Sequence, residues 1–252
     1  MQVLIRTTAL TIAAAMALPS FAGVWQDNFE NEGLDDWEIF NFAPGVESWE
    51  ERTDEDGNGV LTGWIEQADS FSILELKPEG ADPAQWNNYT VRVRARLDSE
   101  LVGEFNTYFG LWLYSNIDRG IYHECYINPQ IARAGTAGIW SRIGDSFGTF
   151  QRGQNFEQGV WYNIKASVET IDRNRDRITF QIDDNEPLVV TWASSIGSGG
   201  VGLVVYYGTV SFDDFELDGA FIPFDGAPNG GGALSVDPKQ KSAQIWGELK
   251  SR

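Results

Sequence analysis

The chain has 252 residues, with 18 basic and 37 acidic side chains, a net charge of −19 and a single cysteine, Cys125. Such a charge repels phosphate backbones and excludes nucleic acid as a partner, and one cysteine excludes an internal disulfide. Ten Trp, eight Tyr and fifteen Phe residues supply enough large apolar surface for a single substantial core.

Residues 1–22 have the features of a secretory signal peptide. Arg6 supplies the positive charge, residues 7–18 form an apolar run, and Ser20 and Ala22 fit a small-x-small cleavage site. The run is shorter than the roughly 20 residues that a membrane-spanning helix needs, and no later segment is better suited. We therefore expect an exported protein, secreted into the periplasm or outside the cell, without a transmembrane segment.

Apolar and polar residues alternate with the period of two that is typical of β-strands, between repeated turn signals. The clearest segments are residues 24–30, 89–97, 108–114, 121–127, 160–168, 177–182, 188–192 and 201–218, the last being two strands broken at Gly208. Many short strands at this spacing are typical of a two-sheet antiparallel sandwich or jelly roll. The sequence predicts an all-β fold, with one domain over residues 23–220.

Three arginines, Arg92, Arg94 and Arg96, lie on one face of the strand predicted over residues 89–97. In so acidic a chain they are expected to pair with carboxylates on neighbouring strands. The alternative is a basic stripe that binds acidic or sulfated glycans, with Arg133 and Arg142 extending it.

The central segments carry the candidate binding residues. Aromatic rings stack on the C–H faces of sugars, and polar side chains bind the hydroxyl groups. Strand alternation places Trp112 and Tyr114 on the same face of the strand predicted over residues 108–114. On the strand predicted over residues 121–127 it places Tyr122 and Glu124 on one face and His123 on the other. Each aromatic residue would also fit a sandwich core. The candidates are Trp112, Tyr114, Tyr122, Glu124, Trp140 and Arg142.

Similar aromatic and acidic patterns occur near both ends of the predicted domain. This similarity predicts that the first and last strands lie side by side, where their carboxylates meet. Calcium prefers six to eight oxygen ligands at about 2.3–2.6 Å, so these acids are candidates for a structural Ca²⁺ site. In the alternative reading they only alternate outward beside buried phenylalanines. The candidate ligands are Asp27, Glu30, Asp213 and Asp214.

The amino-acid composition changes after residue 220. Residues 221–233 are rich in Gly and Pro and are predicted to be a linker. Residues 234–252 form a short, locally basic tail, in which Ile245, Trp246 and Leu249 would share one face of a helical turn. The tail is either a frayed terminus or a segment that docks the protein at the cell surface.

The segments 26–30, 88–93, 109–114, 159–165, 180–184 and 200–217, in this order, resemble the concanavalin A-like jelly-roll superfamily. Within it, the chain is similar to the laminin-G-like group of bacterial secreted domains. The resemblance implies a two-sheet sandwich, often with one structural calcium and a carbohydrate-facing sheet. In the glucanase branch a calcium lies where the first and last strands meet, and the match falls on Asp213, with Asp27 or Glu30 opposite.

The same superfamily contains lectins, binding modules and hydrolases, so catalysis must be argued from residues. Glycosidases need two carboxyl groups at a fixed separation, and the Glu-x-Asp-x-x-Glu signature of jelly-roll glucanases is absent. A triad is disfavoured because no partner for His123 can be identified. The related 3-keto-disaccharide hydrolase domain usually has Asn-Ser-Gly before its central strand, whereas this chain has Asn-Thr-Tyr-Phe-Gly at residues 106–110. That domain also usually has an Arg at the position of Tyr114. Both differences argue against the hydrolase activity.

We therefore predict an exported, non-catalytic domain that binds a glycan or polysaccharide and holds a structural calcium. The alternatives are a sugar hydrolase of the 3-keto-disaccharide type and an adhesive or structural surface protein.

Overall fold

The computed structural model describes residues 23–30, 33–42, 49–66, 70–99, 107–129, 135–143, 146–154 and 156–223, with the backbone alone for 146–154. The predicted signal peptide, most of the predicted linker and the predicted tail lie outside the described residues, and so does Arg133. Among the described residues, no helix is long and apolar enough to cross a membrane.

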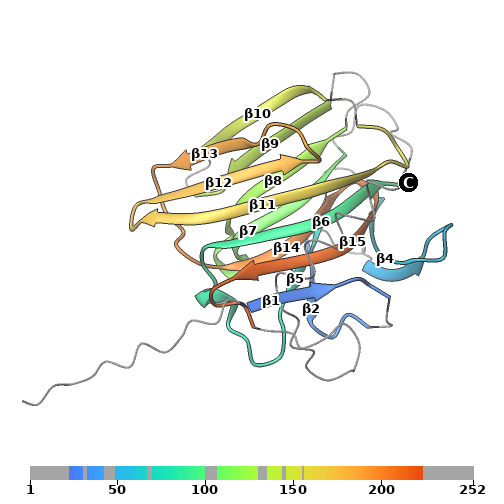
Figure 1. Cartoon of the computed structure of the whole chain (residues 1–252), viewed down its shortest axis with the longest axis horizontal. Helices are drawn as coiled ribbons and strands as arrows, with labels where there is room; N and C mark the ends of the chain where they lie inside the picture. Colours follow the sequence, from blue (N-terminus) through green and yellow to red (C-terminus); the bar gives the residue numbers. More distant parts are fainter. Residues whose placement is uncertain are drawn as a thin grey trace, which may run out of the picture.

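The described residues form two antiparallel sheets that pack face to face, which confirms the predicted all-β sandwich (Figure 1). The eight-stranded sheet has the order β13 (Leu188–Trp192), β12 (Arg175–Ile182), β11 (Trp161–Asp172), β6 (Tyr89–Leu97), β15 (Gly208–Gly219), β4 (Gly59–Ile65) and β3 (Trp49–Thr53), with β1 (Gly23–Asp27) also paired to β15. The seven-stranded sheet has the order β10 (Ser146–Gln154), β9 (Gly135–Ser141), β8 (Ile121–Asn128), β7 (Tyr108–Asn116), β14 (Gly200–Tyr206), β5 (Phe71–Leu76) and β2 (Trp37–Asn41). Two short 3₁₀ helices, η1 (Pro83–Gln85) and η2 (Ile117–Arg119), lie in the connections.

Strand β6 shows how the sequence pattern builds the sandwich. Its apolar residues alternate inward and are all buried, as the period-two pattern predicts. Its arginines face outward and pair with neighbouring acids: Arg92 with Glu216, Arg94 with Asp213 at 3.1 Å, and Arg96 with Asp98 at 2.6 Å. The expected pairing with carboxylates on neighbouring strands is therefore confirmed for Arg92 and Arg94, whereas Arg96 pairs with Asp98, directly after its own strand.

The first and last strands lie side by side, as predicted (Figure 1). Strand β15 pairs with β6 on one side, and on its other side with β4 through its first half and β1 through its second. The packed region extends slightly past the predicted domain end, because the Ile222 side chain is buried in the core between the sheets.

Candidate functional site

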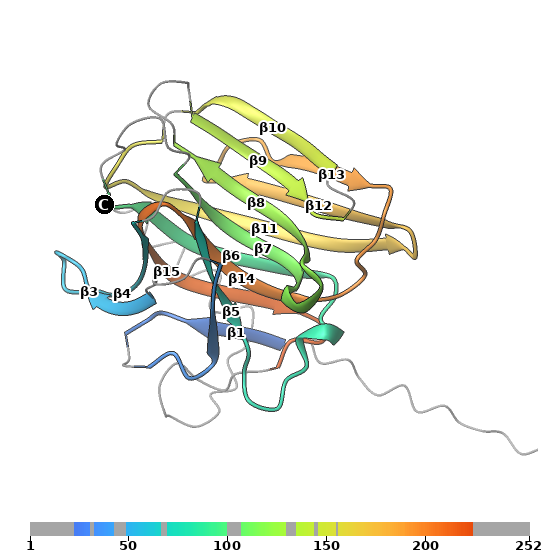
Figure 2. The same cartoon turned by 180° about the vertical axis from the view of Figure 1, so that it is seen from behind.

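A row of paired residues crosses the outer face of the seven-stranded sheet, the face turned away from the other sheet. Trp112 on β7 pairs with Glu124 on β8, and Glu124 pairs with Trp140 on β9. Paired residues on neighbouring strands project to the same side, while Leu111 and Leu113 project into the core between the sheets. Figure 2 views the molecule from this side.

Aromatic side chains cover much of this surface, which we call the aromatic face. It consists of Phe42, Phe71, Tyr108, Trp112, Tyr122, Tyr126, Trp140 and Tyr206. Trp112 stacks on Tyr122 with ring centroids 3.5 Å apart, and Tyr108 stacks on Tyr206 at the same separation. The edge of Trp140 meets Tyr122 at 5.8 Å. Such stacked and edge-to-face contacts join the rings into one continuous array.

The aromatic face has a buried base and a more exposed rim. Trp112, Tyr122 and Glu124 are each only 1% exposed and form the base. Trp140 is half-buried, and Arg142 is exposed beside it. Phe42 lies at the opposite side and is 48% exposed. Of the predicted binding residues, Trp140 and Arg142 are therefore the ones that a ligand can reach directly.

Tyr114 does not share a face with Trp112, contrary to the prediction from alternation. The pairing of β7 with β8 shifts between Leu113 and Asn116, and Tyr114 itself has a φ of 50°. This bulge reverses the direction of the side chain. Tyr114 is fully buried between the sheets, and its hydroxyl lies 3.0 Å from Thr170 Oγ1.

Tyr126 owes its position to a glycine on the neighbouring strand. Its ring lies over Gly138, where an added Cβ would come within 2.6 Å of the ring. The missing side chain leaves room for the ring, which makes a T-shaped contact with Tyr108 at a centroid separation of 5.9 Å.

Five residues of the aromatic face are absent from the sequence-predicted binding set: Phe42, Phe71, Tyr108, Tyr126 and Tyr206. Phe71 and Phe42 were missed because strands β5 and β2 were not predicted. The alternation within residues 70–76 carries the missing signal. Tyr206 joins Phe71 only because β14 lies between β7 and β5, a long-range pairing that the sequence does not reveal.

Glu124 is a carboxyl group inside this aromatic surface. Trp112 Nε1 donates a hydrogen bond to Glu124 Oε1 at 3.0 Å. Burial raises the pKa of Glu124 to about 8, so the carboxyl group is protonated at neutral pH. Burial and the nearby Glu124 also raise the pKa of Tyr122 to about 12.

Polar side chains flank the aromatic face opposite Arg142. The row of Trp112 continues through Gly202 on β14 to Glu75 on β5 and Glu38 on β2. Lys77 forms ion pairs with both glutamates, at 3.5 Å for Glu75. Burial raises the pKa of Glu75. Charged groups of both signs therefore border the aromatic rings, in reach of a ligand that extends across the sheet.

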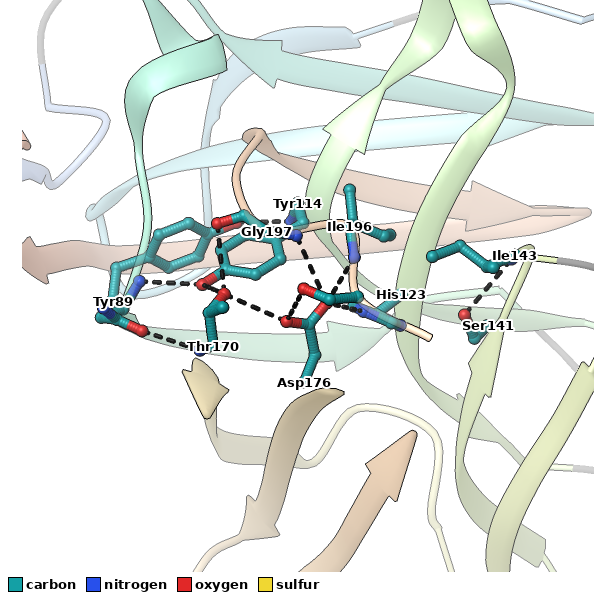
Figure 3. Close-up of polar contacts among 11 residues, drawn as sticks. Tyr89, Tyr114, His123, Ser141, Ile143, Thr170, Asp176, Ile196 and Gly197 are labelled. Carbon is teal, nitrogen blue, oxygen red and sulfur yellow. Dashed lines mark hydrogen bonds and ion pairs between the residues drawn. The ribbon is translucent and has the colours of Figure 1, made fainter. Parts of the chain in front are cut away.

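His123 has a buried partner, Asp176, which the sequence did not reveal (Figure 3). His123 Nε2 lies 3.2 Å from Asp176 Oδ2, and both side chains are fully buried between the sheets. Asp176 also accepts hydrogen bonds from Ser195 Oγ and the backbone N–H of Ile196, each at 2.6 Å. Ser195 donates to the aspartate rather than to the histidine, so these three side chains do not have the arrangement of a catalytic triad.

The four predicted calcium ligands do not converge. Asp27 pairs with the inward-facing Phe215 and accepts a hydrogen bond from Trp37 Nε1 at 3.0 Å. Asp213 instead lies on the outer face with Arg94, because a bulge at Asp214, with φ 51°, offsets the end of β15. Burial and the neighbouring Asp214 raise the pKa of Asp213 to about 6.

Glu30, the fourth predicted ligand, is 3.4 Å from the backbone nitrogen of Gly59. Within the part of the chain that the structure describes, no group of three or more His, Cys, Asp or Glu side chains is arranged to hold a metal ion. As described, these carboxylates do not fit the oxygen-rich shell that calcium requires.

No protein-family model matches the chain, and no curated protein matches it. Among solved structures, the metal-free carbohydrate recognition domain of Emp46p aligns with a TM-score of 0.52 at 10% identity, over 81% of this chain and 98% of that one. The chain shares the fold of this domain, a two-sheet antiparallel sandwich. The potassium-bound form of the same domain aligns equally well, and carbohydrate-binding module CBM66 from Bacillus subtilis aligns with a TM-score of 0.49 at 16% identity, over 72% of this chain and 94% of that one. At these identities the comparisons establish the fold alone.

Proposed function

We propose that the chain is an exported, non-catalytic domain that binds a glycan or polysaccharide on the aromatic face. The observation that carries this proposal is the continuous array of rings on the outer face of one sheet, with Trp140 and Arg142 accessible at its rim. Apolar ring faces suit the C–H faces of sugars, and Arg142, Glu38 and Lys77 supply groups that bind hydroxyls. Emp46p, which shares the fold, is described as a carbohydrate recognition domain.

Replacement of Trp140 tests the site. We expect Trp140→Ala to weaken glycan binding at least about tenfold, because truncation of an aromatic residue that anchors a ligand typically costs more than 1 kcal/mol. The measurement is a glycan-array screen followed by calorimetry on the best oligosaccharide. Trp161→Ala is the matched control, since Trp161 lies on the outer face of the other sheet between Arg94 and Arg96.

Equal losses in both variants would contradict the assignment of the face. Failure of the unmodified domain to bind any glycan would remove the proposed function in favour of an adhesive or structural role. Turnover of a 3-keto-disaccharide would replace it with the hydrolase alternative.

Calcium belongs to the proposal only on sequence grounds. A calcium ion near β1 and β15 would require Asp27 and Asp213 to leave the hydrogen bonds and ion pairs described above. If calcium is bound, a chelator will lower the melting temperature, and added calcium will restore it, because a ligand of the folded state stabilises that state. A melting temperature that does not change with chelator would remove calcium from the proposal.

Export is proposed from residues 1–22, which predict a secreted chain that begins near Gly23. The intact mass of the protein recovered outside the cytoplasm tests this expectation. Docking at the cell surface through residues 234–252 stays a prediction from sequence.

A further inference from the structure

Glu124 is unusual because it is an acidic group at the centre of an apolar surface. It is 1% exposed, and strands β7 and β9 flank it on both sides. Trp112 and Trp140 are its paired neighbours in the cross-strand row. A ligand on the rim therefore does not touch Glu124 directly, and any influence on binding must pass through the side chains that cover it.

A chain of contacts links Glu124 to the exposed rim. The carboxyl group accepts the hydrogen bond of the Trp112 indole at 3.0 Å. The Trp112 ring lies flat on Tyr122, with 11° between the ring planes, and Tyr122 supports Trp140 edge to face at 83°. Because interlocked rings do not deform continuously, a change at the carboxyl group alters the orientation of this stack.

The titratable groups around Glu124 come from every strand packed on it. Among the described residues they are Tyr108 on β7, Tyr122 and Tyr126 on β8, Arg142 after β9 and Tyr206 on β14, with Cys125 on the opposite face of β8. Burial, followed by the nearby Glu124, raises the pKa of Tyr108 and of Tyr206. These tyrosines therefore stay protonated over the pH range in which Glu124 titrates.

We propose that Glu124 is a positioning residue whose protonation controls the aromatic face, so that the face binds an uncharged glycan when the carboxyl group is neutral. The proposal rests on the proposed function and names its ligand class and its regulation. An uncharged ligand fits a protein with a net charge of −19, which repels acidic glycans.

The direction of the pH effect follows from linkage. Burial raises the pKa of Glu124 to about 8 in the free protein. A glycan that covers the face removes water from above the base, so it disfavours the ionised carboxylate further and raises this pKa. Affinity is then constant below pH 7 and falls as pH rises above about 8, by up to tenfold for each pH unit until the bound form also ionises.

Calorimetry between pH 6 and 9.5 measures how glycan affinity depends on pH, with cellohexaose and xylohexaose as uncharged probes. We expect the dissociation constant of the unmodified domain to rise about tenfold between pH 7.5 and 9.5. Glu124→Gln keeps the size and the acceptor for Trp112 Nε1 but cannot ionise, so its affinity should not change with pH. Glu157→Gln, at an exposed position, is the matched control and should retain the pH dependence.

A pH-independent affinity in the unmodified domain, or the same fall in Glu124→Gln, would overturn the proposal. Only Glu124 ionisation predicts both a fall in the parent and its loss in the amide variant. A general weakening of the fold would lower the affinity of both proteins alike.

A second experiment needs no ligand, so it tests the role of Glu124 separately from the proposed function. Near-ultraviolet circular dichroism of the unmodified domain should change with a midpoint near pH 8, as the Trp112–Tyr122 stack responds to ionisation. Trp112→Phe removes the hydrogen bond that favours the carboxylate, so its midpoint should lie at higher pH. If neither oligosaccharide binds at any pH, the proposed function fails, but the circular dichroism titration still tests the role of Glu124. A spectrum that does not change between pH 6 and 9.5 would overturn the proposed role of Glu124.

Discussion

Asp176→Ala should lower the free energy of unfolding by about 3–5 kcal/mol, because it leaves buried hydrogen-bond donors without an acceptor. Asp176 is fully buried on β12 and joins His123 of the opposite sheet to the segment that precedes β14. Thr170 Oγ1 donates to its other oxygen at 3.0 Å and also lies 3.0 Å from the Tyr114 hydroxyl (Figure 3). The truncation therefore disturbs both sheets at once.

Chemical denaturation at pH 7 measures this effect. Asp184→Ala, in the exposed turn after β12, is the matched control and should change stability by less than about 0.5 kcal/mol. Burial alone would raise the pKa of Asp176, but the hydrogen bonds from His123, Ser195 and Ile196 together lower it below its usual value. The stabilisation is thus present at neutral pH and is lost as pH falls through this lowered pKa. A variant as stable as the control would show that the network is not needed for the fold.

The architecture was predictable because it depends on local periodicity. The alternation of β6 fixes which of its residues face the core, and the similar patterns at the two ends of the domain correctly predict that β1 pairs with β15. The pairing of the arginines followed from the excess of acids. In these cases local alternation, the similarity of the two ends and the overall composition were enough to predict a residue's environment.

The site was less predictable because bulges and long-range pairings determine it. One bulge turns Tyr114 away from Trp112, which overturns a prediction from strict alternation. Another places Asp213 on the opposite face from Asp27, so these two predicted calcium ligands do not meet although their strands pair as predicted. The partner of His123 lies 53 residues further along the chain, on the other sheet. The sequence also does not show how deeply a side chain is buried. Trp112 and Tyr122 were therefore predicted to contact a ligand, although they form the buried base of the aromatic face.

Glu124→Gln should stabilise the protein above pH 8 by up to about 5 kcal/mol relative to its effect at pH 4. The carboxyl group has a pKa of 4.5 when exposed in the unfolded chain and about 8 when folded, and each pKa unit corresponds to about 1.36 kcal/mol. The folded state therefore binds more protons than the unfolded state between these values. Stability contributed by Glu124 is fully present below pH 4.5 and decreases until about pH 8, above which it no longer changes.

Urea denaturation of both proteins at pH 4, 6, 8 and 9 measures the difference. Asp213, whose pKa burial and Asp214 raise to about 6, contributes a change of the same sign, but it is common to both proteins and cancels in the comparison. Asp213→Asn is therefore the useful control, since its difference from the unmodified protein should level off near pH 6 rather than pH 8. A Glu124→Gln difference that does not grow with pH would mean that the carboxyl group ionises freely in the folded state. The aromatic face would then accommodate the charged carboxylate. The proposed dependence of glycan binding on pH would have to be abandoned, because it rests on the raised pKa of Glu124.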